Sequence, residues 1–180
     1  MTACAKTYLL MLTVLLPAVN LYAGERPTGW GTTFSGKSTG VYAVIDRGES
    51  ASYFSILLDL RGTIAGKARN PGIKTLYNIE HCFRSWNLAD GAVARFFAGP
   101  GLSIGYVSDT DDYRKGYMAA LYGNMGLRFS FASNVAIKLY LSGEFGFHMD
   151  MKNSYDTSMS IYKAGLKDIL YPEISITYRF

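Results

Sequence analysis

Apolar and polar residues alternate without a break over residues 135–150, VAIKLYLSGEFGFHMD. The odd-numbered positions carry Val, Ile, Leu, Leu, Gly, Phe, Phe and Met, and the even-numbered ones carry Ala, Lys, Tyr, Ser, Glu, Gly, His and Asp. Because successive side chains of a β-strand point to opposite faces of the sheet, this pattern predicts one strand with an apolar and a polar face. Globular strands have about five or six residues, so this fold must keep two environments apart over an unusual length.

The same period of two recurs along most of the chain. It predicts further strands at 39–46, 51–62, 74–86, 93–107, 115–131 and 174–180. Short connections rich in Gly, Asn, Asp and Ser alternate with longer polar ones, which predicts an antiparallel up-and-down sheet. The short connections lie at 47–50, 87–91 and 131–134, and the long ones at 62–74, 108–116 and 150–158.

The polar face indicates which side of this sheet is inside. A soluble barrel puts its apolar face in the centre, whereas a barrel in a membrane puts it outside. Here the polar positions are mostly Gly, Ser, Ala, Tyr and Asn, and charged residues make up only 18% of the chain, against about 25% in soluble proteins. Such a face suits the narrow interior of an eight-stranded barrel. The sequence therefore predicts an all-β fold, a single antiparallel up-and-down transmembrane β-barrel with its apolar face in lipid.

The charged residues of the polar face are expected to pair with one another inside the barrel, because an unpaired buried charge is strongly destabilising. This predicted network consists of Asp59, Arg61, Glu80, Arg84, Arg95, Arg128, Lys138, Glu144, Glu173 and Arg179. Aromatic residues near the strand ends are expected to form girdles at the two membrane interfaces. They include Trp86, Tyr106, Tyr117, Phe131 and Tyr178.

The alternation leaves one strand of the barrel open between two segments. Seven are clear, and an even number is expected for a closed barrel. The eighth is either 29–36, in a hairpin with 39–46, or 158–165, which would reverse the direction of all earlier strands. The first alternative keeps the short turns on the periplasmic side together with the C-terminus and is preferred. Residues 163–170 are then expected to form a helical turn in the last outer loop.

The N-terminus has the features of a secretory signal peptide. Lys6 precedes an apolar stretch at 8–18, and Ala23 ends a plausible cleavage site. The stretch is shorter than the about 20 residues of a membrane-spanning helix. We therefore expect a signal peptide at 1–23 and a barrel domain at 24–180. Cys82 would be the one cysteine left after cleavage, so no internal disulfide is expected.

The last residues, ISITYRF, resemble the terminal signal by which the bacterial barrel-assembly machinery recognises outer-membrane proteins. The residues that carry this likeness are Ile174, Ile176, Tyr178 and Phe180. Together with FAGPGLSIGYVSD and NMGLRFSF, the ending makes the whole chain from residue 24 similar to small outer-membrane barrels of the OmpA/OmpX-like and PorT-like families. The resemblance implies an outer-membrane location, contact with the lipid bilayer and lipopolysaccharide, and insertion by the assembly machinery.

Three function classes fit such a barrel. The preferred one is a non-enzymatic protein with a structural, adhesive or assembly role through its extracellular loops, including an unidentified extracellular ligand. The second resembles PagL-type lipid A deacylases or PagP-type acyltransferases, for which His148 and Glu144 are the candidate acid–base residues. The third is a narrow, porin-like channel, which a filled eight-stranded lumen disfavours.

Other chemistry finds little support in the sequence. Ser85 lies four residues from His81, about 13 Å along a strand, which is too far for a catalytic pair, and a local break in register is the simpler explanation for His81 on the apolar face. The acidic segment 109–112 lacks the ligand spacing of a calcium loop. The net charge of +4 is scattered rather than clustered, which disfavours a nucleic-acid interface. No cofactor or metal is expected.

Overall fold

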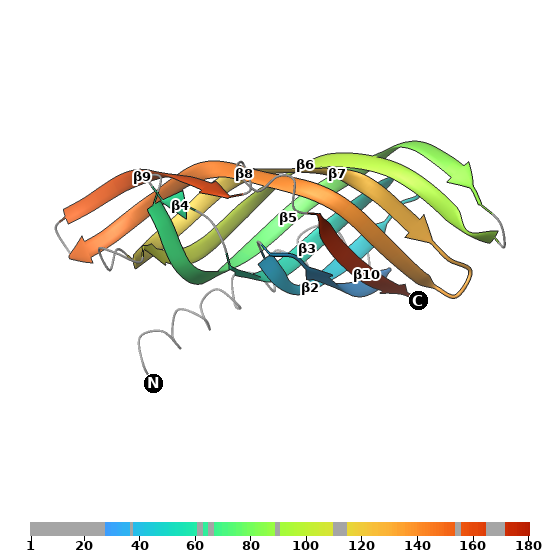
Figure 1. Cartoon of the computed structure of the whole chain (residues 1–180), viewed down its shortest axis with the longest axis horizontal. Coiled ribbons are helices and arrows are strands. Elements are labelled where there is room, and N and C mark those ends of the chain that lie inside the picture. The colour runs from blue at the N-terminus through green and yellow to red at the C-terminus, as the bar shows by residue number, and fades with distance from the viewer. Residues whose placement is uncertain are drawn as a thin grey trace.

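The computed structural model describes residues 28–36, 38–60, 63–64, 67–88, 91–109, 115–153, 156–164 and 172–180. The predicted signal peptide lies outside these residues. The described chain forms one antiparallel sheet that closes on itself (Figure 1). Its eight barrel strands are β1 (Gly29–Phe34), β2 (Ser38–Asp46), β3 (Ser50–Asp59), β5 (Lys67–Asn87), β6 (Val93–Asp109), β7 (Lys115–Ser130), β8 (Val135–Asn153) and β10 (Glu173–Arg179).

Closure comes from β10, which pairs with β1 on one side and with β8 on the other. Following paired residues once around the wall leads from Leu139 of β8 back to Met149 of the same strand, ten residues farther along. The residues passed on the way are Ile174, Phe34, Thr39, Leu58, Ile73, Tyr106 and Tyr117. Eight strands with this shift tilt by about 40° from the barrel axis. The interior of such a barrel is just wide enough to be filled by side chains. The predicted eight-stranded up-and-down barrel is confirmed.

The first hairpin supplies the eighth barrel strand, as preferred above, but the rival segment is also a strand. β9 (Asp156–Ala164) pairs with β8 from Glu144 outward, whereas β10 pairs with β8 only as far as Tyr140. β9 therefore covers an edge of β8 that would otherwise leave its backbone groups without partners. The prediction of a helical turn at 163–170 is wrong for Lys163 and Ala164, which belong to β9, and the rest of that segment lies outside the described residues.

At the end opposite the short turns, the wall continues beyond the eight-stranded part. The two-residue strand β4 (Thr63–Ile64) pairs with both β5 and β9. The segments 62–74 and 150–158, predicted as long loops, are therefore largely strand, because β5 begins at Lys67 and β8 runs to Asn153. Figure 1 shows β8 and β9 reaching far past β2, β3 and β10 at this end. The polar composition of these segments concealed the strands, because it removed the apolar half of the alternation.

The short turns gather at the other end of the barrel, which we call the turn end. It holds the connections after β2, β5 and β7, and the C-terminal strand also finishes there, since the Arg179 N–H donates to the Asn134 carbonyl at 2.8 Å. Gly48, in the turn after β2, has a φ of +88°. This left-handed conformation strains any residue with a Cβ.

Replacing Gly48 with alanine is therefore expected to lower the free energy of unfolding by about 1–2 kcal/mol. Gly36→Ala is the matched control, because a Cβ at Gly36 meets no atom within 4 Å and its φ lies outside the left-handed range. Denaturant unfolding of the folded barrel measures both variants. Equal stability of the two would show that the turn tolerates the strain.

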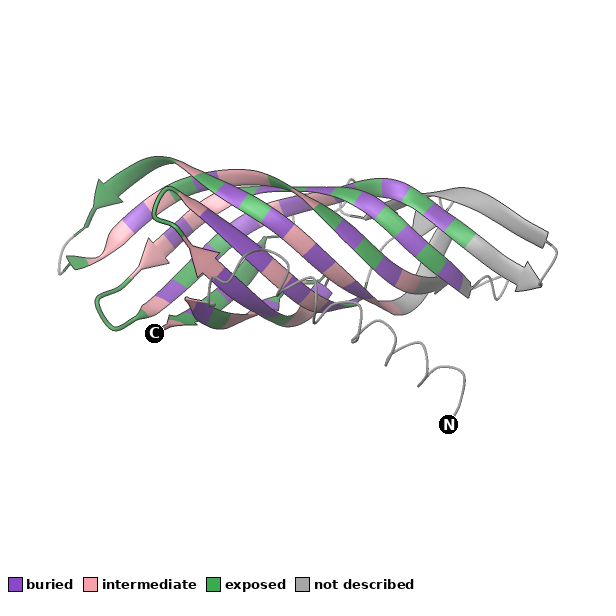
Figure 2. Cartoon of the chain, turned by 180° about the vertical axis from the view of Figure 1, so that it is seen from behind, coloured by how far each residue is buried: buried purple, intermediate pink, exposed green. Residues whose placement is uncertain are grey.

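The wall has its apolar residues outside and its polar residues inside. Figure 2 shows buried and exposed residues alternating along the long strands. Leu121, Leu139 and Phe145 are 65%, 45% and 46% exposed, whereas Glu80, Arg128 and Lys138 are 2–3% exposed. Aromatic rings fill much of the interior between the charges, and those that are buried there are Tyr42, Tyr53, Phe97, Tyr122 and Tyr140.

Candidate functional site: the polar interior

The central ion pair of the interior joins β8 to β5 across the barrel. Lys138 Nζ donates to Glu80 Oε1 at 2.7 Å. The Nδ2 groups of Asn124 and Asn78 donate to the same oxygen at 2.8 and 3.4 Å. Each of these residues is buried. A buried carboxylate and ammonium need such direct contacts, because both have lost their hydration. The alternation predicted both charged members of the pair.

Aromatic rings enclose the ammonium group on its remaining sides. Lys138 Nζ lies 3.7 Å from the ring centre of Tyr53. Three further ring centres lie 5.1–5.7 Å from it, those of Tyr42, Phe97 and Tyr140. A desolvated cation over ring faces contributes about 2 kcal/mol of attraction in favourable cases. We refer to Lys138, Glu80 and the four rings as the lysine cage.

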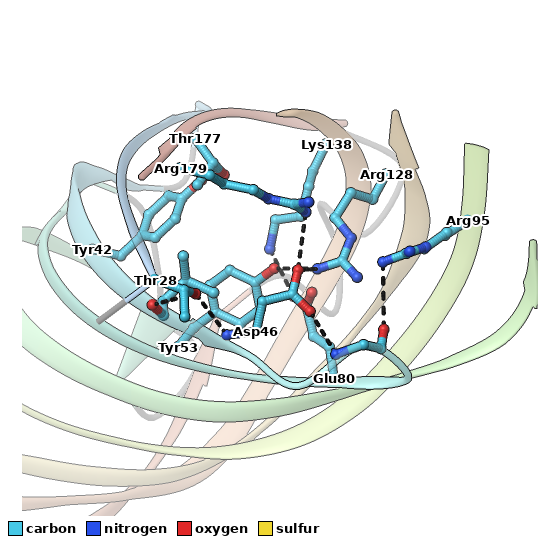
Figure 3. A network of polar contacts seen from close by, with 12 residues as sticks. Thr28, Tyr42, Asp46, Tyr53, Glu80, Arg95, Arg128, Lys138, Thr177 and Arg179 are labelled. Carbon is cyan, nitrogen blue, oxygen red and sulfur yellow. Dashed lines mark hydrogen bonds and ion pairs between the residues drawn. The ribbon is translucent and has the colours of Figure 1, made fainter. Parts of the chain in front are cut away.

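A second cluster lies at the turn end (Figure 3). Asp46 Oδ2 is 3.0 Å from Arg179 Nη2 and 3.5 Å from Arg128 Nη1. Arg128 Nη1 also donates to the Tyr53 hydroxyl at 3.1 Å, which connects this cluster to the lysine cage. Arg95 lies nearby and donates to the Gly48 carbonyl at 3.4 Å. The sequence analysis missed Asp46 because it is the last residue of its strand, where the alternation ends.

A third cluster lies towards the opposite end of the interior. Lys74 Nζ is 2.6 Å from Glu144 Oε2 and 3.6 Å from Asp59 Oδ1. Lys74 was absent from the predicted network, although its even position matches Asn78 and Glu80 on the same strand. That parity was the signal that could have found it. Nearby, the Ser142 hydroxyl donates to Glu173.

Two neutral hydrogen bonds fasten the closing strands from inside. The Tyr42 and Thr177 hydroxyls are 2.7 Å apart, and so are the Thr33 and Tyr140 hydroxyls. They join β2 to β10 and β1 to β8, so polar contacts reinforce both sides of the closure.

His148, the candidate general base, is completely buried, and Glu144 is 3% exposed. They are four residues apart on one face of β8, which separates their Cα atoms by about 13 Å. The cavity left within the interior has a volume of about 30 Å³, room for only a water molecule or two. The described interior thus brings His148 and Glu144 onto one face without an open pocket between them.

Arg84 differs from its predicted place because β5 contains a bulge. Cys82 pairs with Phe97 and Arg84 pairs with Phe96, so Phe83 is an extra residue without a partner on β6. One inserted residue moves everything after it to the opposite face. Arg84 is therefore exposed on the outer wall beside Phe96. The register break expected near His81 is present two residues later, and Arg61 lies outside the described residues.

The residues of the proposed assembly signal share the outer wall. Ile174, Ile176 and Tyr178 are each about half exposed along β10, and Phe180 is 70% exposed at its end. Four of the five predicted girdle aromatics are also exposed, and Tyr106 is half-buried. Their positions agree with an outward-facing apolar band.

The described ranges contain no group of three or more His, Cys, Asp or Glu residues that could hold a metal ion. Among the same residues, no helix is long and apolar enough to cross a membrane. Comparison with protein-family models, with curated protein sequences and with solved structures finds no match to this chain. The functional conclusion therefore rests on the barrel fold and on its arrangement of apolar residues outside and polar residues inside.

Proposed function

We propose that this chain is an integral β-barrel protein of the bacterial outer membrane with a structural, adhesive or assembly role and no catalytic activity. The observation that carries the proposal is the polarity of the barrel, with ion pairs sealed inside and large apolar side chains exposed outside. In water this wall would leave an apolar surface far larger than soluble monomers expose. In a bilayer the same wall is correctly solvated, and closure of the sheet gives its barrel strands a hydrogen-bonding neighbour on each side, as a spanning sheet needs.

The remaining parts of the proposal rest on the sequence. The signal peptide at 1–23 would export the chain, and the C-terminal signal ending at Phe180 would direct it to the barrel-assembly machinery. These features, with the eight strands, support a place among the OmpA/OmpX-like or PorT-like barrels. The bilayer and lipopolysaccharide would then surround the apolar wall.

A non-enzymatic role is preferred because, among the described residues, the cavity in the barrel interior is too small for a substrate. His148 is buried, and the cavity lined by Glu144 and Ser142 has a volume of only about 30 Å³. The same small volume disfavours a channel. The strands that extend past β10, namely β8 and β9, would instead carry the outer loops above the membrane and offer a surface to a ligand or to another cell.

Cell fractionation tests the proposal. The full chain, expressed in a Gram-negative host, is expected to sediment with the outer membrane and to migrate faster on a gel before boiling than after it, because a folded barrel resists detergent. A chain lacking residues 1–23 is the control and is expected to remain unfolded in the cytoplasm. A compact monomer that stays dissolved without detergent would overturn the proposal.

A further inference from the structure

The outer wall has a groove where three neighbouring strands lack protruding side chains. Pro100 of β6 pairs with Gly123 of β7, which pairs with Gly143 of β8, so the three form one row across the sheet. A Cβ added at either glycine would meet no atom within 4 Å, which means that both face open space. Interior glycines such as Gly126 differ, because a Cβ there would collide with the neighbouring strand. The row is therefore not required by packing.

Bulky side chains form the two sides of this groove. Leu121 and Phe145 stand on one side of the row, and Met125 and Leu141 stand on the other. The groove has a volume of about 780 Å³, within the range of about 300–1,000 Å³ for small-molecule sites. Nearly all the surface that lines it is apolar, so its occupant must be apolar over most of its length.

The end of the groove nearest the turns is different, because polar side chains are placed there. His81 and Phe83 line it, with their rings 5.1 Å apart in an edge-to-face arrangement. The bulge at Phe83 then turns Arg84 outward, where its guanidinium lies 5.5 Å from the Trp86 ring centre. β5 ends at Asn87, three residues after Arg84. An imidazole and a guanidinium thus follow the apolar groove towards the turn end.

These positions match the layers of a bilayer if the barrel spans one, so the inference rests on the proposed function. Trp86 and Arg84, near the end of β5, would lie at the headgroup level of the periplasmic leaflet, where Trp and long cationic side chains prefer to be. The row of Pro100, Gly123 and Gly143 would lie at the level of the acyl chains. Arg binds phosphate through paired charge-assisted hydrogen bonds.

We infer that this groove binds one anionic phospholipid of the periplasmic leaflet, with its phosphate at Arg84 and His81 and an acyl chain along the glycine row. A second copy of this chain fits the surface less well. A two-fold dimer brings the same patch of both copies together, which would place the Arg84 guanidinium of one copy near the same cation of the other. The phospholipid has the opposite charge at the required depth.

Native mass spectrometry of the folded full-length protein in detergent, with added phosphatidylglycerol or phosphatidylcholine, tests this inference. The wild type is expected to retain one phosphatidylglycerol in preference to phosphatidylcholine. Arg84→Gln is expected to weaken phosphatidylglycerol binding about tenfold, as for the loss of a charged hydrogen bond, and His81→Gln to weaken it less. Gly123→Leu and Gly143→Leu fill the groove and are expected to reduce retention of both lipids.

Two variants serve as matched controls, each checked for folding by the heat-dependent gel shift. Arg47→Gln removes an exposed cation from the turn after β2, and Val41→Phe adds bulk to the outer wall on β2, away from the groove. Both should retain phosphatidylglycerol as the wild type does. The inference is overturned if the wild type retains both lipids equally or if Arg84→Gln retains phosphatidylglycerol as the wild type does. It is also overturned if the wild type is a lipid-free dimer and Gly123→Leu is a monomer. Failure of the protein to fold as a membrane barrel would overturn the proposed function as well, whereas a folded barrel without lipid preference would overturn this inference alone.

Discussion

Glu80→Gln is expected to lower the free energy of unfolding by about 3–5 kcal/mol, the range for removing one partner of a buried ion pair. Glutamine keeps the size of the side chain but leaves the Lys138 ammonium without a counter-charge at 2.7 Å. The rings of the lysine cage cannot replace a carboxylate, because their attraction for a cation is weaker than a direct ion pair. Urea unfolding in lipid vesicles, followed by the heat-dependent gel shift, measures the loss.

Two further variants make this measurement specific. Glu49→Gln changes an exposed carboxylate in the turn after β2 and should alter the stability by no more than about 0.5 kcal/mol. Glu80→Gln combined with Lys138→Met removes both charges and should recover most of the lost stability, since an apolar replacement of a buried pair is often neutral or stabilising. A single Glu80→Gln variant as stable as the Glu49→Gln variant would show that the ion pair contributes little to the fold.

Leu121→Arg is the second change with a large expected effect. Leu121 is 65% exposed near the middle of the outer wall. In a bilayer a cation at this depth costs about 2–4 kcal/mol, whereas an exposed substitution on a protein in water changes stability by about 0.5 kcal/mol or less. The same unfolding measurement in vesicles is therefore expected to show a large loss.

Phe131→Arg is the depth control, because Phe131 is exposed at the turn end directly after β7. Its replacement should cost about 0–1 kcal/mol, the value near an interface. If Leu121→Arg and Phe131→Arg are equally well tolerated, the apolar wall is not in contact with hydrocarbon and the proposed function fails. The comparison thus tests the membrane assignment independently of cell fractionation.

The long strands could be predicted well because their signal is local. The pattern predicted a strand at 115–131 and the structure has Lys115–Ser130 for β7, and the prediction for 93–107 differs from β6 by two residues at one end. The polarity of each residue indicates the face of the strand on which it lies, so one misassigned residue does not change the assignment of the others. The pairing of Lys138 with Glu80 was less accessible, because it depends on which positions of β8 and β5 lie at the same height in a sheared barrel.

The site was predicted less completely than the fold. Asp46 was missed at the end of its strand, and Lys74 was missed although it shares the parity of Glu80. The structure gives these two residues direct ion pairs with Arg179 and Glu144, respectively. Arg84 was expected inside because its position continues the parity of Glu80. A single bulged residue, Phe83, reversed that parity. His81 on the apolar face indicated a register break nearby, but the pattern did not locate it before Arg84.

The sequence by itself determined that the chain forms long strands with one apolar and one polar face, since side-chain alternation is a property of each strand alone. Only the tertiary structure decided the rest. The ten-residue shift around the barrel selects the partners of each buried charge. The pairing of β10 with β8 stops at Tyr140, which leaves an edge of β8 for β9 to cover, and the bulge in β5 places Arg84 on the outer wall. Each of these depends on how distant strands align. The alternation alone does not determine that alignment, because a slip of two residues leaves every side chain on the same face.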